Sequence, residues 1–101
     1  MNIRVLRSAR RTIADGIRFY DRQQSGLGAY FLSSIMSDLR SLGIHAGIHQ
    51  KHGPYHRMIC SRFPYSIYYL KSGMDVDVYA VLDDRRDPKR SDELLSRIGS
   101  Q

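Results

Sequence analysis

Apolar residues recur at helical spacing in two successive stretches of the first half of the chain, residues 8–24 and residues 28–42. The positions that form these stripes are Ala9, Ile13, Ile17 and Tyr20 in the first stretch, and Leu27, Phe31, Ile35, Leu39 and Leu42 around the second. This spacing predicts two amphipathic helices. Only a short glycine-containing break separates them, so they are expected to form an antiparallel hairpin.

The second half of the chain changes to an alternating pattern that is typical of strands. Residues 2–6 predict a short first strand, and residues 55–60, 63–70 and 74–82 predict three more. In the last of these, the apolar positions are Met74, Val76, Val78, Ala80 and Leu82. One face of this strand should therefore pack on a core, while the other is at least partly exposed. Residues 44–54, rich in His and Gly, are expected to form a loop.

Pro88 ends the strand pattern and is suited to the first turn of a short C-terminal helix. The element order is therefore strand, two helices, three strands and a helix. This order predicts an α+β fold: an N-terminal strand, an antiparallel helical hairpin packed on a small antiparallel sheet of about three to four strands, and a short C-terminal helix. A chain of 101 residues has room for one domain, expected to span residues 1–101.

The net charge of +6 is unevenly placed and is carried mainly by arginine. Residues 1–60 hold nine Lys or Arg against three acidic residues, residues 61–101 hold seven against seven, and 13 of the 16 basic residues are Arg. Because a guanidinium forms a planar fork that suits phosphate and carboxylate, this indicates an anionic partner, either nucleic acid or an acidic protein segment. The alternative is a solvated surface that is basic without a specific partner.

Several classes of protein are not expected from the sequence. No apolar run approaches the roughly 20 residues that span a bilayer, and the N-terminus is too charged for a secretory signal, so a cytoplasmic location is expected. Cys60 is the only cysteine, which excludes an internal disulfide, and its apolar neighbours favour a buried structural thiol over a nucleophile.

Four histidines lie in or near the predicted loop: His45, His49, His52 and His56. They form two pairs with a spacing of four, which brings ligands to one metal only on a helix. The glycines and the proline within residues 43–54 argue against a helix there. No metal and no other cofactor are therefore expected.

Tyrosines concentrate on the predicted strands. Tyr69 shares its side of the strand with Ile67 and Phe63, so it is expected in the core, whereas Tyr68 points to the opposite face. Stacking on nucleic acid bases remains an alternative for the tyrosines outside the core.

Two motifs in the second half resemble the ParE/RelE superfamily of bacterial toxins, and are closest to its ParE-like plasmid-stabilisation branch. The first is the strand that bears Arg57, followed by the aromatic stretch Phe63-Pro64-Tyr65-Ser66-Ile67-Tyr68-Tyr69. The second is the last strand, which runs from Val76 into Arg85-Arg86-Asp87-Pro88. The leading strand and the helical hairpin are also similar to the family's first half, so the resemblance covers about residues 2–90.

This resemblance implies the toxin component of a type II toxin–antitoxin system, neutralised by a cognate antitoxin in a hetero-oligomer. ParE-like members are associated with poisoning DNA gyrase, whereas RelE-like members cut mRNA in the ribosomal A site. RelE-type nucleases carry an ionisable or aromatic residue near the C-terminus, and residues 89–95 contain no Tyr or His. The tryptophan that many ParE-like members carry after this motif is also absent, since the chain has no Trp.

The favoured hypothesis is therefore a ParE-like toxin that binds gyrase and is not itself an enzyme. Its target-binding residues are expected to be Arg85, Arg86, Lys89 and Arg90. The alternative is a RelE-type ribosome-dependent endoribonuclease, which would use Lys51, Arg57, Arg62, Arg85 and Arg86 on RNA phosphates, with His52 or His56 as a possible acid or base. A nucleic-acid-binding module, or a toxin-derived protein that has lost its activity, is a third hypothesis.

Overall fold

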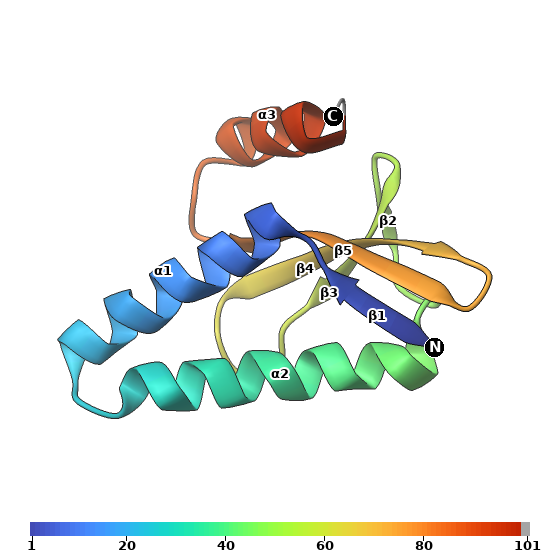
Figure 1. Ribbon diagram of the computed structural model, residues 1–101. Helices are drawn as coiled ribbons and strands as arrows, with labels where there is room; N and C mark the ends of the chain where they lie inside the picture. Colours follow the sequence, from blue (N-terminus) through green and yellow to red (C-terminus); the bar gives the residue numbers. More distant parts are fainter. Residues whose placement is uncertain (100–101) are drawn as a thin grey trace.

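A sheet lies between two layers of helix in the computed structural model, which describes residues 1–99 (Figure 1). The helical hairpin covers one face of the sheet and the C-terminal helix covers the other. The elements in chain order are β1 (Asn2–Val5), α1 (Arg7–Gln23), α2 (Leu27–His45), β2 (Lys51–His52), β3 (Tyr55–Ile59), β4 (Tyr65–Ser72), β5 (Asp75–Asp83) and α3 (Pro88–Gly99). This arrangement confirms the predicted α+β fold, with its N-terminal strand, helical hairpin and C-terminal helix.

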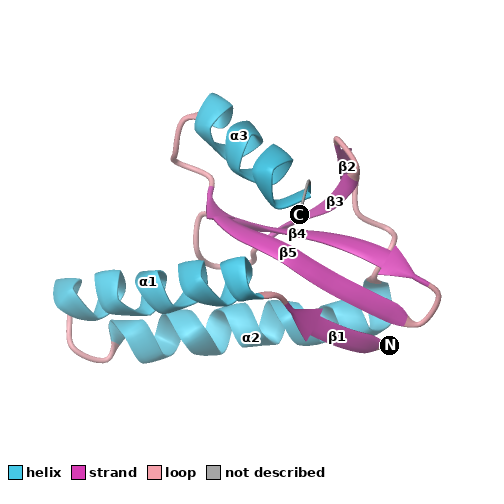
Figure 2. Ribbon diagram, turned by 45° about the horizontal axis from the view of Figure 1, so that its top comes forward, coloured by secondary structure: helices cyan, strands magenta, loops and turns pink. Residues whose placement is uncertain are grey.

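The sheet has five strands in the order β1-β5-β4-β3-β2 (Figure 2). β1 runs parallel to β5, and the other neighbours are antiparallel. The count exceeds the expected three to four strands because β2 forms inside the segment predicted to be a loop. Lys51 pairs with His56, and His52 pairs with Tyr55. A strand of two residues is too short to show an alternating pattern, so the sequence gives no signal for it.

The turn between α1 and α2 brings the two helices into very close contact. A Cβ on Gly28 would lie 2.5 Å from the backbone oxygen of Ile17 and 2.9 Å from the Cβ of Asp21, so glycine is required there. The Asp21 carboxylate accepts hydrogen bonds from the backbone N–H groups of Gly26 and Gly28, at 3.0 and 3.3 Å. The hairpin is thus fixed at its closed end.

The core between the hairpin and the sheet contains the predicted stripe residues. Phe31, Ile35 and Leu42 of α2 are fully buried there, as are Ile67 and Tyr69 of β4. The expected core position of Tyr69 is thereby confirmed, and Cys60 is buried in the same core as expected (7% exposed).

A β-bulge in β5 reverses which face of the sheet the residues after it point to. Tyr68 pairs with Ala80 and Tyr69 pairs with Val78, so Tyr79 is an extra residue in β5. Val76, Val78 and Val81 therefore face the hairpin, while Ala80 and Leu82 face α3. The prediction that the apolar residues from Met74 to Leu82 share one face was wrong, because a strict alternation cannot anticipate an inserted residue.

The second face of the sheet is also largely covered. A smaller apolar cluster fills the space under α3, and its buried members are Tyr55, Tyr68, Ala80, Leu82 and Leu95. Tyr68 is only 4% exposed, so it is a packing residue of this second cluster. The alternating pattern of residues 74–82 predicted that one face of this strand is partly exposed. That pattern carries no information on where the C-terminal helix packs, so it could not show that α3 covers this face. None of the helices in the described part of the chain combines the length and apolar character needed to cross a bilayer.

Candidate functional site

The side chain of Arg85 is held in one orientation where the chain leaves β5. Its Nε and Nη2 atoms donate to the two carboxylate oxygens of Asp83, at 3.0 and 2.8 Å, and its backbone N–H donates to the same carboxylate at 2.9 Å. This hydrogen bonding lowers the pKa of Asp83 and raises the pKa of Arg85. Arg85 still has 54% of its side chain exposed, so the fixed guanidinium is available to a partner.

This arginine lies on the hairpin side of the sheet. Its Nη2 atom is 3.4 Å from the hydroxyl of Tyr20 on α1. Arg85 and Arg86 together line a cleft of about 210 Å³, which Thr12 and Phe19 of α1 also line. The structure therefore brings the two adjacent arginines of the sequence motif to one concave surface.

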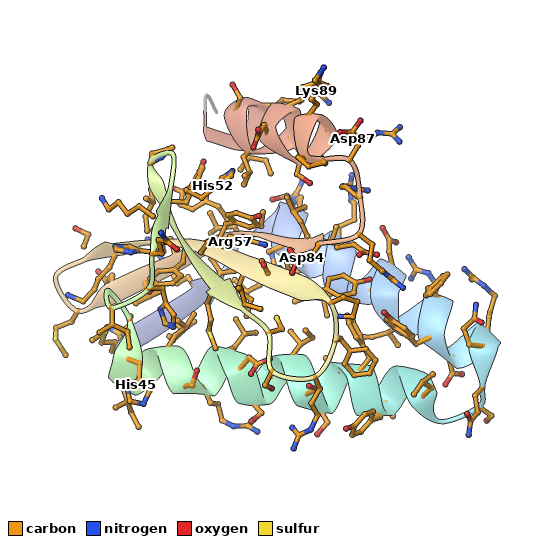
Figure 3. The ribbon with its side chains drawn as sticks, turned by 180° about the vertical axis from the view of Figure 1, so that it is seen from behind. His45, His52, Arg57, Asp84, Asp87 and Lys89 are labelled. Atoms are coloured by element: carbon orange, nitrogen blue, oxygen red, sulfur yellow. The ribbon has the colours of Figure 1, made fainter. Side chains whose placement is uncertain are left out.

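Lys89 and Arg90 are exposed in the first turn of α3. Asp87 precedes this turn, and its side chain accepts a hydrogen bond from the backbone N–H of Lys89 at 3.0 Å. Figure 3 shows Asp87 and Lys89 at the start of α3, beyond the end of the sheet. Of the four predicted target-binding residues, Arg85 and Arg86 thus share a cleft, while Lys89 and Arg90 extend the basic surface along the chain.

A second polar cluster lies on the opposite face of the sheet. Arg57 donates from Nε to the Ser66 hydroxyl and from Nη2 to Asp84, both at 3.0 Å. The Ser66 hydroxyl, which is fully buried, lies 2.8 and 3.0 Å from the two oxygens of Asp84. Burial opposes the charged form of Arg57, but the hydrogen bond to Asp84 helps to raise its pKa overall. Figure 3 shows Arg57 and Asp84 side by side on the face below α3.

Arg57 also lines a cleft at the edge of the sheet, of about 570 Å³, together with Lys51 and His52 of β2. The Nε2 atom of His52 lies 2.8 Å from the Asp92 carboxylate of α3, and its ring packs edge-on against Tyr68. Two cationic side chains and two imidazoles, those of His49 and His52, are thus combined in one concave site.

The four arginines and one lysine expected in a nuclease site do not gather in one place. Lys51 and Arg57 share the cleft at the sheet edge, whereas Arg85 and Arg86 line the cleft on the hairpin side. Arg62 is exposed in the loop between β3 and β4. The buried Asp38 of α2 fixes that loop, by accepting hydrogen bonds from the backbone N–H and hydroxyl of Ser61 at 3.1 and 2.9 Å.

Sequence reasoning did not single out Ser66, Asp84 or Asp92 as members of a site. Ser66 is the one small polar residue in the aromatic stretch of residues 63–69, and this contrast was the available signal. Asp92 is brought to His52 by the packing of α3, which no local pattern predicts. Within residues 1–99, no group of three His, Cys, Asp or Glu side chains is placed to hold a metal ion.

Comparison with solved structures relates this fold to a toxin–antitoxin protein. The chain is similar to a chain of the chromosomal ParDE TA system from P. aeruginosa, with a TM-score of 0.72 and 14% sequence identity over 80% of this chain and 92% of that chain. The two chains share a fold. The fold implied by the resemblance to the ParE/RelE superfamily is thereby confirmed. No protein-family model matches the sequence, and no curated protein matches it.

Proposed function

We propose that this chain is the toxin component of a type II toxin–antitoxin system, of the ParE-like branch, and that it inhibits growth by binding DNA gyrase in the cytoplasm. The observation that carries the proposal is the fold shared with a chain of the ParDE TA system, which extends over 80% of this chain and 92% of that one. The sequence motif that ends in Arg85 and Arg86 supports the same branch.

The surface proposed to bind the target is the cleft of Arg85 and Arg86, extended by Lys89 and Arg90. Because Asp83 already holds Arg85, little side-chain entropy is lost when a partner binds this guanidinium. A planar guanidinium recognises carboxylates or phosphates with defined geometry. The exposed Phe19 of α1 adds an apolar contact at the same cleft. This combination is suited to recognising a protein surface.

A cognate antitoxin is the second proposed partner. The charge of +6 favours an antitoxin segment with acidic residues, which would order on binding across the hairpin and the sheet. A hetero-oligomer of toxin and antitoxin follows from this proposal.

A RelE-type ribosome-dependent endoribonuclease is the second candidate function, and the cleft of Lys51, His52 and Arg57 favours it. Two cations could stabilise a phosphate, and an imidazole could transfer a proton. Two observations argue for the binding function instead. His52 is engaged by Asp92 and Arg57 by Asp84, and the arginines of the C-terminal motif line a different cleft.

The test is induced expression in bacteria, followed by analysis of growth and of ribosome-bound mRNA. We expect growth to stop while mRNA on ribosomes remains intact, and growth to resume when the cognate antitoxin is co-expressed. Cleavage of mRNA at defined codon positions soon after induction would instead support the endoribonuclease. Unchanged growth at high expression would count against both toxin functions.

A further inference from the structure

The hydroxyl of Tyr69 fastens the segment 46–50, which connects α2 to β2. Tyr69 is fully buried in β4, and its hydroxyl accepts a hydrogen bond from the backbone N–H of Gly47 at 2.8 Å. The same hydroxyl lies 2.5 Å from Nδ1 of His49. Two residues of the segment are therefore held by one buried phenol.

The hydrogen bonds of the Tyr69 hydroxyl are best satisfied by a neutral His49. The Tyr69 oxygen accepts the hydrogen of Gly47, and every proton of this group has an acceptor when the hydroxyl proton donates to Nδ1 of His49. Nδ1 must then be unprotonated, which requires the neutral imidazole with its proton on Nε2. A protonated His49 would present a second N–H to the Tyr69 oxygen, and the hydroxyl proton would lose its acceptor inside the protein.

The groups around His49 disfavour its charged form. The His56 ring stacks on Tyr69 and its Nδ1 lies 2.7 Å from the backbone oxygen of His49, to which it donates. His45 ends α2, and the Lys71 side chain of β4 lies next to Gly47. Burial of the imidazole, followed by the charges of His56 and His45, lowers the pKa of His49. None of these perturbing groups is a carboxylate that would stabilise an imidazolium.

We propose that Tyr69 and His49 form a proton-sensitive latch, which holds the segment 46–50 on the sheet while His49 is neutral and releases it when His49 is protonated. The segment leads directly into β2, and the backbone oxygen of Gln50, just before β2, accepts a hydrogen bond from the backbone N–H of Arg57 at 2.9 Å. His49 also lines the cleft that contains Lys51 and Arg57. Opening of the latch would therefore reshape this cleft and the edge of the sheet, whichever target the protein has.

The closed segment should be less stable in acid, because it lowers the pKa of His49. The closed segment holds His49 with a pKa below that of a free histidine, about 6.5. The open state therefore binds more protons once the pH falls below that value, and the closed state loses stability as the solution becomes more acidic. Above about pH 7 the latch should stay closed.

The experiment is amide hydrogen exchange of Gly47, measured by NMR at pH 7.5 and pH 5.5 and corrected for the intrinsic rate. We expect protection of this amide to fall at the lower pH in the native sequence. Tyr69→Phe should remove protection at both pH values, and His49→Gln, which does not titrate, should keep it equal at both. His52→Gln is the matched control, since His52 is a half-exposed histidine of β2 outside the latch, and it should retain the pH dependence.

Equal protection of Gly47 at both pH values in the native sequence would overturn the proposal. So would a pH dependence that persists in His49→Gln. Because Tyr69→Phe could impair folding, the ring nitrogens of His49 provide a second test in the native protein. Their chemical shifts at pH 7.5 should show a proton on Nε2 and none on Nδ1, and a protonated Nδ1 would contradict the latch.

Discussion

The Asp83 carboxylate binds the Arg85 guanidinium through two parallel hydrogen bonds, of 3.0 and 2.8 Å, and thereby fixes the direction of a half-exposed cation. The two residues are separated by a single position, so the pair forms within the turn that follows β5. The local sequence itself therefore orients the proposed target-binding arginine. The Asp83–Arg85 pair positions a charge rather than stabilising the fold, because exposed ion pairs contribute only about 0–1 kcal/mol to the free energy of unfolding.

Replacing both arginines of the cleft should separate toxicity from stability. We expect Arg85→Ala combined with Arg86→Ala to abolish growth arrest, while the free energy of unfolding changes by less than about 1 kcal/mol. The matched control is Lys51→Ala, which removes a cation from the other cleft and should leave growth arrest unchanged. Full toxicity of the double variant would remove this cleft from the target-binding surface.

The Asp83–Arg85 pair should also contribute to the acid sensitivity of the fold. The pKa of Asp83 is lower in the folded protein than its ordinary value of about 3.9. The ionised carboxylate therefore contributes fully to the free energy of unfolding above about pH 5, and this contribution is lost as the pH falls. Because the pair is partly exposed, the loss should not exceed about 1 kcal/mol. Asp83→Asn should reduce the difference between urea unfolding at pH 7 and pH 3, whereas Glu93→Gln on exposed α3 should not.

The buried hydroxyl of Ser66 should matter more for stability than its size suggests. Ser66→Ala removes a partner of both Arg57 and Asp84 in a place that water does not reach. We expect a loss of about 1–3 kcal/mol in urea unfolding, since hydrogen bonds to charged groups are stronger than neutral ones. Ser72→Ala, at the exposed end of β4, is the control and should change stability by less than about 0.5 kcal/mol. A similar small effect at Ser66 would show that the cluster is not coupled to folding.

Replacing each of the two glycines of α2 by alanine should change the stability in opposite directions. Gly28→Ala places a methyl group 2.5 Å from the Ile17 backbone oxygen, so the helices must separate and stability should fall by about 1–3 kcal/mol. A Cβ on Gly43 would meet no atom within 4 Å beyond its chain neighbours and its own helix backbone, so Gly43→Ala should stabilise the helix by about 0.5–1 kcal/mol. Thermal unfolding of both variants measures the contrast, and equal effects would contradict the described helix contact.

The sequence was most informative where its pattern was continuous. Two long amphipathic stripes predict α1 and α2, and the core position of Tyr69 follows from its alternation with Ile67. The α+β class follows from the order of these segments. These features depend on residues that are neighbours on one helix or strand.

Features that depend on distant residues could not be predicted. The bulge at Tyr79 is specified by pairing with β4, so the sides of Ala80 and Leu82 were assigned incorrectly. The cleft at the sheet edge depends on β2, which is too short to have a pattern of its own. The separation of Arg57 from Arg85 onto opposite faces likewise emerges only from the three-dimensional packing of the sheet.

The most direct test of the central claim is inhibition of DNA gyrase by the purified protein in a supercoiling assay. The proposed function predicts that the native sequence blocks supercoiling, that Arg85→Ala with Arg86→Ala does not, and that Lys51→Ala still does. If the native protein leaves supercoiling unchanged at concentrations well above that of gyrase, while it cuts mRNA on ribosomes, the gyrase-binding function is contradicted.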